Sequence, residues 1–290
     1  MIASGGNRVG WEDLPATVHA AVAEVLGASV VHAVSQPGGF SPGSADRVET
    51  TAGTRAFVKA VSPAQNAASP AMHAREGRIA ALLPPGVPAP RLLGAREVGE
   101  WQVLVLEDVA GRHPALPWRR DELGLVVAAL ETLVTVATPC PVPGLPTARE
   151  SLATELPADA LAHLDGDSLV HLDLRADNLL ISGGRAVLLD WPHACSGPAW
   201  LDLLALLFEV DRLGGEDLAE EVLRTSTLTG DVEPHVLTTV LAGFAVFFLT
   251  RAAEPDPPGL PTLRAFQRAQ GEALQHWVAR RRGGSAPECA

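Results

Sequence analysis

Four side chains between positions 171 and 190 have the types and the spacing that phosphate chemistry requires. His171, Asp173 and Asn178 form the pattern H-x-D-x-x-x-x-N, and Asp190 follows twelve residues after Asn178 at the end of an apolar run. The apolar runs that flank a Ser-Gly-Gly-Arg turn at 182–185 predict a β-hairpin that returns Asp190 to the side of Asn178. Carboxylate and carboxamide oxygens suit Mg²⁺, which takes its other ligands from water and substrate phosphates.

A solitary lysine offers a fifth group for the same chemistry. Lys59 is the one lysine among 22 basic residues, the rest being arginines, and it lies in the strand-like run 56–61. An ammonium is a compact charge on a flexible stem and suits phosphate oxygens, whereas a guanidinium is a planar fork. Phosphoryl transfer needs a lysine on the phosphates, a metal cation, and a carboxylate that orients the attacking hydroxyl. Lys59, the Asn178–Asp190 pair and Asp173 can supply all three.

At these residues the chain resembles the protein-kinase-like fold and, within it, the aminoglycoside phosphotransferase family of small-molecule and antibiotic kinases. The resemblance extends from a glycine-rich turn near Gly38 to the last expected helix. It implies an α+β bilobal fold and an ATP-dependent transfer of the γ-phosphoryl group to a hydroxyl of a small molecule. The N-lobe, residues 1–107, would hold a five-stranded antiparallel sheet with helices. The C-lobe, residues 108–282, would be mainly helical around the catalytic β-hairpin, and 283–290 would be a flexible tail.

The resemblance assigns roles in the catalytic segment. Asp173 would orient the acceptor hydroxyl and accept its proton, and Arg175 would offset charge on the transferred group. Asn178 and Asp190 would hold Mg²⁺ on the nucleotide phosphates. His171 would brace the loop as a structural residue. The family's common pattern is H-G-D-x-H-x-x-N, so the leucine at 172 and the arginine at 175 are departures from it.

Further roles follow from the resemblance outside this segment. Lys59 would position the α- and β-phosphates of ATP or GTP. In the family an acid on the next helix steadies this lysine, and Glu76 is the one acid in the expected helix 69–83. Asp202 would anchor the catalytic loop from a later helix. Backbone groups of the inter-lobe hinge, at Glu107 and Val109, would read the adenine edge.

A glycine-rich turn precedes the second expected strand. Because glycine lets backbone N–H groups approach phosphates that a Cβ would obstruct, this turn is expected to cover the nucleotide. It departs from the strict G-x-G-x-x-G of protein kinases. The residues concerned are Gly38, Gly39, Ser41 and Gly43.

The charge balance bears on partners. A net charge of −12 at pH 7 disfavours nucleic acid, whose binding needs a basic surface. An acidic cleft would attract a cationic acceptor, and Glu209 and Asp211 are acids that could recognise amines. An acidic composition also serves solubility, so the charge favours a cationic acceptor without identifying it. The sequence does not indicate an oligomeric state.

Cysteine usage and hydropathy bear on the compartment. The three cysteines, at 140, 195 and 289, have no spacing typical of a disulfide framework or a zinc site. The first ten residues lack the basic start and apolar run of a signal peptide. The apolar stretch 236–250 has fifteen residues, short of the roughly 20 that span a bilayer. We therefore expect a cytoplasmic protein that does not enter a membrane.

Three alternatives stay open. The acceptor could be a metabolite, such as a choline-like amine, a homoserine-like amino acid or a sugar. The chain could be a nucleotide-binding interaction module without catalysis. A metal-dependent hydrolase built on His171 and Asp173 would need more ligands, and His163 and His193 lack metal-site spacing.

Hydrophobic periodicity and turn residues predict the elements that position these groups. Strands are expected at 29–35, 47–51, 56–61, 90–93 and 101–106, before the hairpin. Helices are expected at 11–26, 69–83, 121–138, 148–164 with an interruption at Pro157, 198–213, 216–225, 232–254 and 263–281.

Overall fold

Five strands of the N-terminal part form one antiparallel sheet, as predicted, and their order is β1-β2-β3-β5-β4. The computed structural model describes residues 8–36, 42–257 and 262–283. In the middle of the sheet, Lys59 on β3 pairs with Ala45 on one side and Leu104 on the other. The strands are β1 (Val30–Ser35), β2 (Ser44–Thr50), β3 (Arg55–Val61), β4 (Leu92–Val98) and β5 (Trp101–Glu107).

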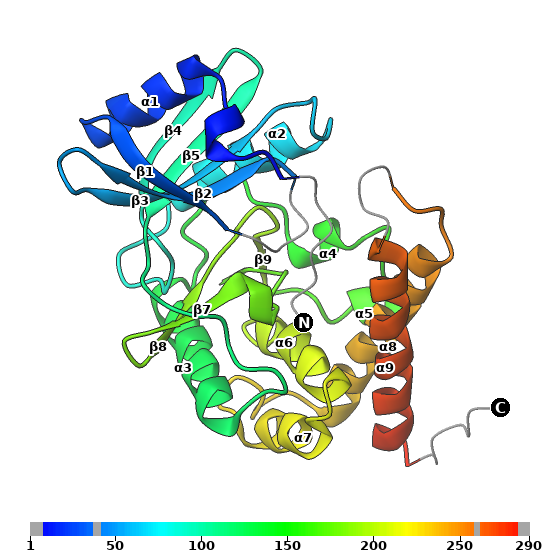
Figure 1. Ribbon diagram of the computed structural model, residues 1–290. Coiled ribbons are helices and arrows are strands. Elements are labelled where there is room, and N and C mark those ends of the chain that lie inside the picture. The colour runs from blue at the N-terminus through cyan, green and yellow to red at the C-terminus, as the bar shows by residue number, and fades with distance from the viewer. Residues whose placement is uncertain (1–7, 37–41, 258–261, 284–290) are drawn as a thin grey trace.

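The two faces of the sheet carry different helices (Figure 1). Side chains alternate between faces along a strand, so Val103 and Val105 join the core under α1 (Ala16–Leu26). Leu104 points the other way, against Gly77 of α2 (Ser69–Ala80), where a Cβ would come within 2.8 Å of Leu104. The sheet therefore fixes α2 next to the strand that bears Lys59.

The predicted β-hairpin that joins Asn178 to Asp190 is confirmed. β7 (Leu179–Ser182) pairs antiparallel with β8 (Arg185–Leu188), and both turn glycines, 183 and 184, have positive φ as such a two-residue turn requires. A short 3-10 turn, η2 (Ala176–Asn178), precedes β7. An additional pairing that the sequence did not suggest joins β6 (Ser168–Val170) to β9 (Cys195–Gly197).

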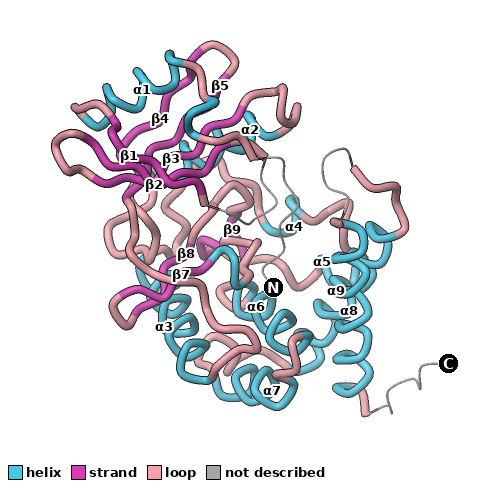
Figure 2. The backbone as a smooth tube through the Cα atoms, in the orientation of Figure 1, coloured by secondary structure: helices cyan, strands magenta, loops and turns pink. Residues whose placement is uncertain are grey.

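The larger part of the molecule is a helical layer below the sheet (Figures 1 and 2). Its central helix, α6, is buried along almost its whole length, because other elements surround it. The expected helix at 148–164 is instead two short helices. The first ends at Ser151, and Pro157 directly precedes the second. The helices are α3 (Arg120–Val136), α4 (Ala148–Ser151), α5 (Ala158–Leu161), α6 (Leu201–Arg212), α7 (Glu216–Thr225), α8 (Pro234–Ala252) and α9 (Leu263–Arg281).

Helix α8 is the one described helix that is long and apolar enough to cross a membrane by length and composition. One such helix is weak evidence, because a core helix of a globular protein has the same character. Here α8 packs along α9 and against α5, with Leu237, Val240 and Leu241 buried.

Part of the predicted glycine-rich turn lies outside the described residues, namely Gly38, Gly39 and Ser41, as does the expected tail beyond Gly283. Gly43 is described, and its φ is +100°. A Cβ there would lie 2.5 Å from the carbonyl oxygen of Ala60. Val9 N–H donates to the carbonyl oxygen of Gly43 at 3.1 Å. Gly43 is thus required because its backbone lies between Val9 and Ala60 of β3, with no room for a Cβ on the side of Ala60.

We predict that Gly43→Ala lowers the free energy of unfolding by about 3 kcal/mol, from left-handed strain and from displacement of β3. Gly53→Ala is the matched control, because Gly53 also has positive φ (+76°) but no atom lies within 4 Å of its added Cβ. It should cost only about 1 kcal/mol. Urea unfolding midpoints of the two variants measure the difference, and equal midpoints would contradict the packing argument.

Candidate active site

A cleft of about 1000 Å³ separates the sheet from the helical layer. Ligand pockets commonly reach about this size, so the cleft has room for a nucleotide and a second small molecule. Its walls bring together the predicted residues Lys59, Glu76, Asp173, Asn178 and Asp190 from distant parts of the sequence.

Lys59 is held by two carboxylates. Its Nζ donates to Glu76 at 2.7 and 2.9 Å and to Asp190 Oδ1 at 2.9 Å. Burial alone would lower the pKa of Lys59, but Asp190 and Glu76 raise it above its ordinary value. Burial opposes ionisation of Asp190, but Lys59 outweighs it and the pKa of Asp190 is lowered. Burial raises the pKa of Glu76 although Lys59 opposes the shift. The predicted Lys59–Glu76 pair is formed.

Asn178 is oriented so that its oxygen is left for a ligand. Its Nδ2 donates to the carbonyl oxygen of Asp173 at 2.8 Å and to Asp173 Oδ2 at 3.0 Å. Leu189 N–H donates to the carbonyl oxygen of Asn178 at 2.8 Å, which holds the hairpin mouth closed. Since both amide hydrogens are used by Asp173, the carboxamide oxygen is the free acceptor of this side chain.

The donor set fits Mg²⁺. A carboxamide oxygen from Asn178 and a carboxylate from Asp190 are two hard oxygen ligands, and Mg²⁺ commonly takes one or two protein ligands plus substrate phosphates. No group of three or more His, Cys, Asp or Glu side chains that could hold a metal occurs within residues 8–36, 42–257 and 262–283. Two protein oxygens at this place leave the other Mg²⁺ positions to water and to the phosphates of a substrate.

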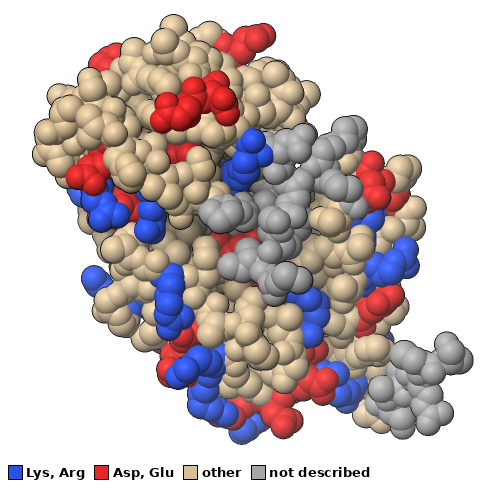
Figure 3. All heavy atoms as spheres, in the orientation of Figure 1, with Lys and Arg blue, Asp and Glu red and all other residues tan. Residues whose placement is uncertain are grey.

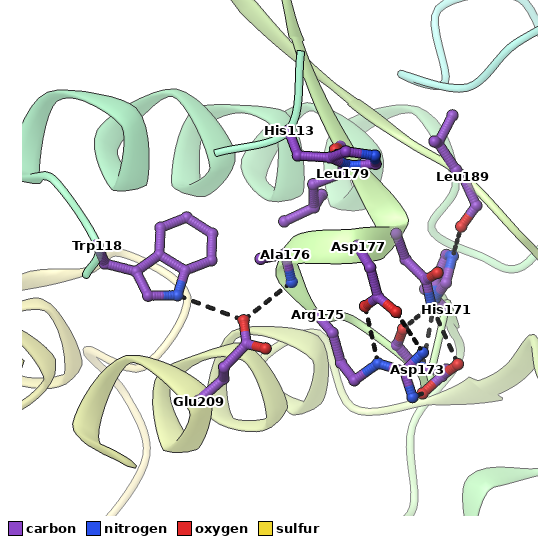
Figure 4. A network of polar contacts seen from close by, with 11 residues as sticks. His113, Trp118, His171, Asp173, Arg175, Ala176, Asp177, Leu179, Leu189 and Glu209 are labelled. Atoms are coloured by element: carbon purple, nitrogen blue, oxygen red, sulfur yellow. Dashed lines mark hydrogen bonds and ion pairs between the residues drawn. The ribbon is translucent and has the colours of Figure 1, made fainter. Parts of the chain in front are cut away.

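Asp173 lies between a cation and the open cleft. Its side chain is 31% exposed, and Arg175 Nη1 lies 3.4 Å from its Oδ1. Arg175 also donates to Asp177 at 3.0 and 3.1 Å, so it bridges the two acids (Figure 4). Burial raises the pKa of Asp173 although Arg175 opposes the shift. A raised pKa makes this carboxylate a better proton acceptor.

His171 supports the catalytic loop from inside, as predicted. Its Nε2 hydrogen bonds the carbonyl oxygen of Leu189 at 2.7 Å, and Asp173 N–H donates to its Nδ1 at 3.3 Å. This pattern requires the neutral imidazole with its proton on Nε2. The ring also contacts the buried Trp191 edge-on, with 4.7 Å between ring centroids.

The side chain of Asp202 anchors the same loop by binding backbone N–H groups of the loop. Its two oxygens accept hydrogen bonds from the N–H groups of His171 at 2.8 Å and Leu172 at 2.9 Å. Burial raises the pKa of Asp202 to about 6, against these hydrogen bonds. Leu172 has φ +66°, the left-handed region that favours glycine. Its conformation explains why a glycine is common at this position in the family that the sequence resembles.

Glu107 and Val109, the residues expected at the hinge, line the cleft. Arg47 Nη2 already donates to the carbonyl oxygen of Val109 at 2.8 Å. Arg47 and Arg55 also pair with the buried Asp108, at 3.1 and 2.8 Å. These contacts fix the hinge against β2 and β3, and they were not predicted, because they join residues more than fifty positions apart.

The acids that the sequence analysis offered for amine recognition are engaged inside the fold. Glu209 Oε2 accepts from Trp118 Nε1 at 3.3 Å and from Ala176 N at 2.9 Å (Figure 4). Asp211 is paired with Arg280, and neither acid lines the cleft. The hypothesis that these two acids bind an amine is therefore wrong.

On the face in Figure 3, described basic and acidic side chains lie beside one another on both lobes.

Sequence reasoning also missed residues of the cleft. Arg8 and His73 line it near Lys59, and five phenylalanines form much of its opposite wall. For the phenylalanines a signal existed, because they gather in the last third of a chain whose aromatic content is only 4%. For Arg8 and His73 the surrounding sequence offers none.

The fold and part of the sequence match known phosphotransferases. Residues 142–235 match the model of the phosphotransferase enzyme family, APH. A solved aminoglycoside phosphotransferase APH(4)-Ia, a thermostable mutant with ADP and hygromycin B, is 16% identical, with 93% of this chain and 100% of that chain covered and a TM-score of 0.62. Amicoumacin kinase hAmiN, with AMP-PNP, Ca²⁺ and Ami, is 14% identical, with 84% and 88% covered and a TM-score of 0.55.

A choline/ethanolamine kinase family protein from Mesorhizobium loti is 18% identical, with 80% of this chain and 90% of that chain covered and a TM-score of 0.50. No curated protein sequence matches significantly. At these identities the structural likeness establishes the protein-kinase-like fold, which confirms the predicted fold class. The family match spans the motif from His171 to Asp190. Residues 142–235 and the fold are therefore similar to those of kinase-type phosphotransferases, and the predicted resemblance is confirmed.

We predict that His171→Gln reduces the loss of stability on acidification. Burial lowers the pKa of His171 from 6.5 to about 4. Between these values the unfolded chain binds more protons than the folded chain, so this group lowers the free energy of unfolding as the pH falls through that window. From pH 7 to pH 5 its contribution is about 2 kcal/mol.

Urea unfolding at pH 7 and pH 5 measures this effect, with His235→Gln as a control at an exposed position. The control should keep the wild-type difference between the two pH values, and the His171 variant should lose about 2 kcal/mol of it. An unchanged difference in the His171 variant would show that another group titrates.

Proposed function

We propose that this protein transfers the γ-phosphoryl group of ATP to a hydroxyl of a small molecule. The observation that carries the proposal is the meeting of Lys59, Asp190 and the Asp173–Asn178 pair across one cleft, which contains both a phosphate-binding amine and a candidate base. Phosphoryl transfer depends mainly on positioning and charge stabilisation, and these groups supply both.

In the proposed mechanism the roles follow from these contacts. Lys59, kept charged and extended by Glu76, positions the nucleotide phosphates. Asp173 accepts the proton of the acceptor hydroxyl while the hydroxyl oxygen attacks the γ-phosphorus. The bond from this phosphorus to the β–γ bridging oxygen breaks, and ADP leaves. Arg175, which bridges Asp173 and Asp177, offsets charge that develops on the transferred group. Asn178 and Asp190 would hold Mg²⁺, which when bound neutralises charge on the phosphates.

The nucleotide assignment has support from similar structures. The APH(4)-Ia structure holds ADP with hygromycin B, and the hAmiN structure holds AMP-PNP with Ca²⁺. We propose ATP with Mg²⁺ for this chain, and a competition between ATP and GTP decides the base preference. We also propose a cytoplasmic location, which the two described cysteines, both free, accommodate.

The acceptor has competing candidates. A cationic antibiotic such as an aminoglycoside is the proposal from net charge, and a metabolite alcohol is the alternative. The metabolite alternative has a counterpart in the choline/ethanolamine kinase family protein. A screen that measures transfer of labelled phosphate from ATP to aminoglycosides, macrolides, amino alcohols and sugars separates these two acceptor classes. A catalytically silent nucleotide-binding module predicts nucleotide binding with no transfer to any of these.

We predict that Asp173→Asn lowers the transfer rate by about 10²–10⁴-fold while nucleotide affinity and folding stay as in the wild type. Asparagine keeps an oxygen for the Asn178 amide but cannot accept the proton. The measurement is single-turnover transfer from labelled ATP to an acceptor found in the screen. Asp165→Asn is the control, because Asp165 is 73% exposed and paired only with Arg149. A rate near wild type for Asp173→Asn would remove Asp173 as the base.

We predict that Asp190→Ala abolishes the gain in nucleotide affinity that Mg²⁺ confers. The substitution removes one proposed metal ligand and one partner of Lys59. Titrations of a fluorescent ATP analogue, with Mg²⁺ and with EDTA, measure the gain. Asp121→Ala, at an exposed surface pair with Arg119, should keep it. If the alanine at 190 leaves the Mg²⁺-dependent gain intact, the metal role is refuted.

A further inference from the structure

One wall of the cleft is aromatic. Phe208 comes from α6, Phe266 from α9, and Phe244, Phe247 and Phe248 from one face of α8 at i, i+3 and i+4. Ring centroids are 5.7 Å apart for Phe208 and Phe248, 6.2 Å for Phe208 and Phe244, and 4.8 Å for Phe247 and Phe248. These five are among the seven phenylalanines of the chain. Phe208, Phe244, Phe247 and Phe248 form one connected aromatic cluster.

This wall lies on the side of the candidate base. Phe208 precedes Glu209, which holds the backbone N–H of Ala176, three residues after Asp173. Leu172 and Leu174, on either side of Asp173, line the same cleft as the rings. A molecule that rests on the phenylalanines can therefore present a hydroxyl to Asp173, while the sheet side with Lys59 is left for the nucleotide.

Two acids near this wall, Glu155 in the lining of the cleft and Glu254 just after α8, are already paired with arginines. Glu155 accepts from Arg251, whose Nε lies 3.1 Å from Glu155 Oε2. Glu254 pairs with Arg251 at 3.0 Å and with Arg264 at 2.8 Å. A polycationic acceptor would have to lose water from each ammonium group on binding. These carboxylates could pair with an ammonium group only if they released an arginine.

Two rings of the wall also carry a cation of the protein. Arg251 lies over the Phe247 ring at 5.9 Å, and Arg212 lies over the Phe266 ring at 5.5 Å from ring centroid to guanidinium carbon. A ligand ammonium that approached these rings would meet guanidinium groups of the same sign. The wall therefore presents apolar rings to a ligand, and its ring faces at Phe247 and Phe266 are already occupied by cations of the protein.

We propose that the acceptor is a neutral alcohol with a large apolar or aromatic part, which packs on this phenylalanine wall and points its hydroxyl at Asp173. This rests on the proposed kinase function and gives its substrate class. It departs from the polycationic acceptor that the net charge suggests, because charge summed over the whole surface does not describe this cavity. Transfer of apolar area from water to the wall supplies the affinity.

The test is a binding measurement that needs no turnover. Calorimetric titration with 2-(2-naphthyl)ethanol, hygromycin B and choline, each with AMP-PNP and Mg²⁺, compares a neutral aromatic alcohol with a polycation and with a small quaternary ammonium. We expect the naphthyl alcohol to bind most tightly. Its dissociation constant should rise about tenfold in Phe247→Ala. Val246→Ala is the matched control, because Val246 is on the same helix, is 50% exposed and does not line the cleft.

Phe248→Leu is a second variant that keeps apolar volume, in case the alanine variant fails to fold. It should weaken the naphthyl alcohol less than Phe247→Ala does. Tighter binding of hygromycin B or of choline than of the naphthyl alcohol would overturn the proposal. So would naphthyl binding that no phenylalanine substitution weakens.

The same measurement separates this inference from the kinase function. If the naphthyl alcohol binds at the wall but no alcohol in the screen accepts phosphate, the kinase proposal fails and the apolar site stands. If alcohols are phosphorylated but the accepted ones are polycations, the kinase function stands and the apolar site is refuted.

Discussion

The ion cluster of Lys59, Glu76 and Asp190 is the interaction on which the remaining structure depends. A charged lysine in the interior is tolerated only when opposite charges surround it, and here one acid comes from α2 and the other from the loop after β8. Sheet, helix and catalytic hairpin thus meet at one nitrogen. The packing of Leu104 against Gly77 keeps α2 close enough for this contact. The cluster joins the two lobes before any ligand is present.

A second constraint shapes the catalytic loop, and it acts through the backbone. Asp202 accepts hydrogen bonds from two successive backbone N–H groups. The neutral ring of His171 hydrogen bonds both the carbonyl oxygen of Leu189 and the N–H of Asp173. These contacts hold Leu172 at φ +66° and allow Asp190 to lie at φ +67°, conformations that cost energy for side chains other than glycine. The hydrogen bonds to the buried Asp202 carboxylate therefore offset the backbone strain at these two residues.

The sequence predicted the parts of the site that adjacent residues determine. The hairpin that joins Asn178 to Asp190, the strand of Lys59 and the helix of Glu76 all follow from local periodicity and turn residues. Local sequence patterns did not predict the phenylalanine wall, the pairing of Arg47 with the hinge, or the true partners of Glu209 and Asp211. Each of them joins segments far apart in the chain, and only packing brings such segments together.

The isolation of the one lysine has a consequence for chemical reactivity. An ε-amine attacks aldehydes and acyl donors only when it is deprotonated, and two carboxylates hold the pKa of Lys59 above its ordinary value. Its side chain is also only 16% exposed. Apart from the α-amine, this chain therefore offers no nucleophilic amine to glycating sugars or acyl phosphates, and Lys59 is shielded by the same contacts that position it.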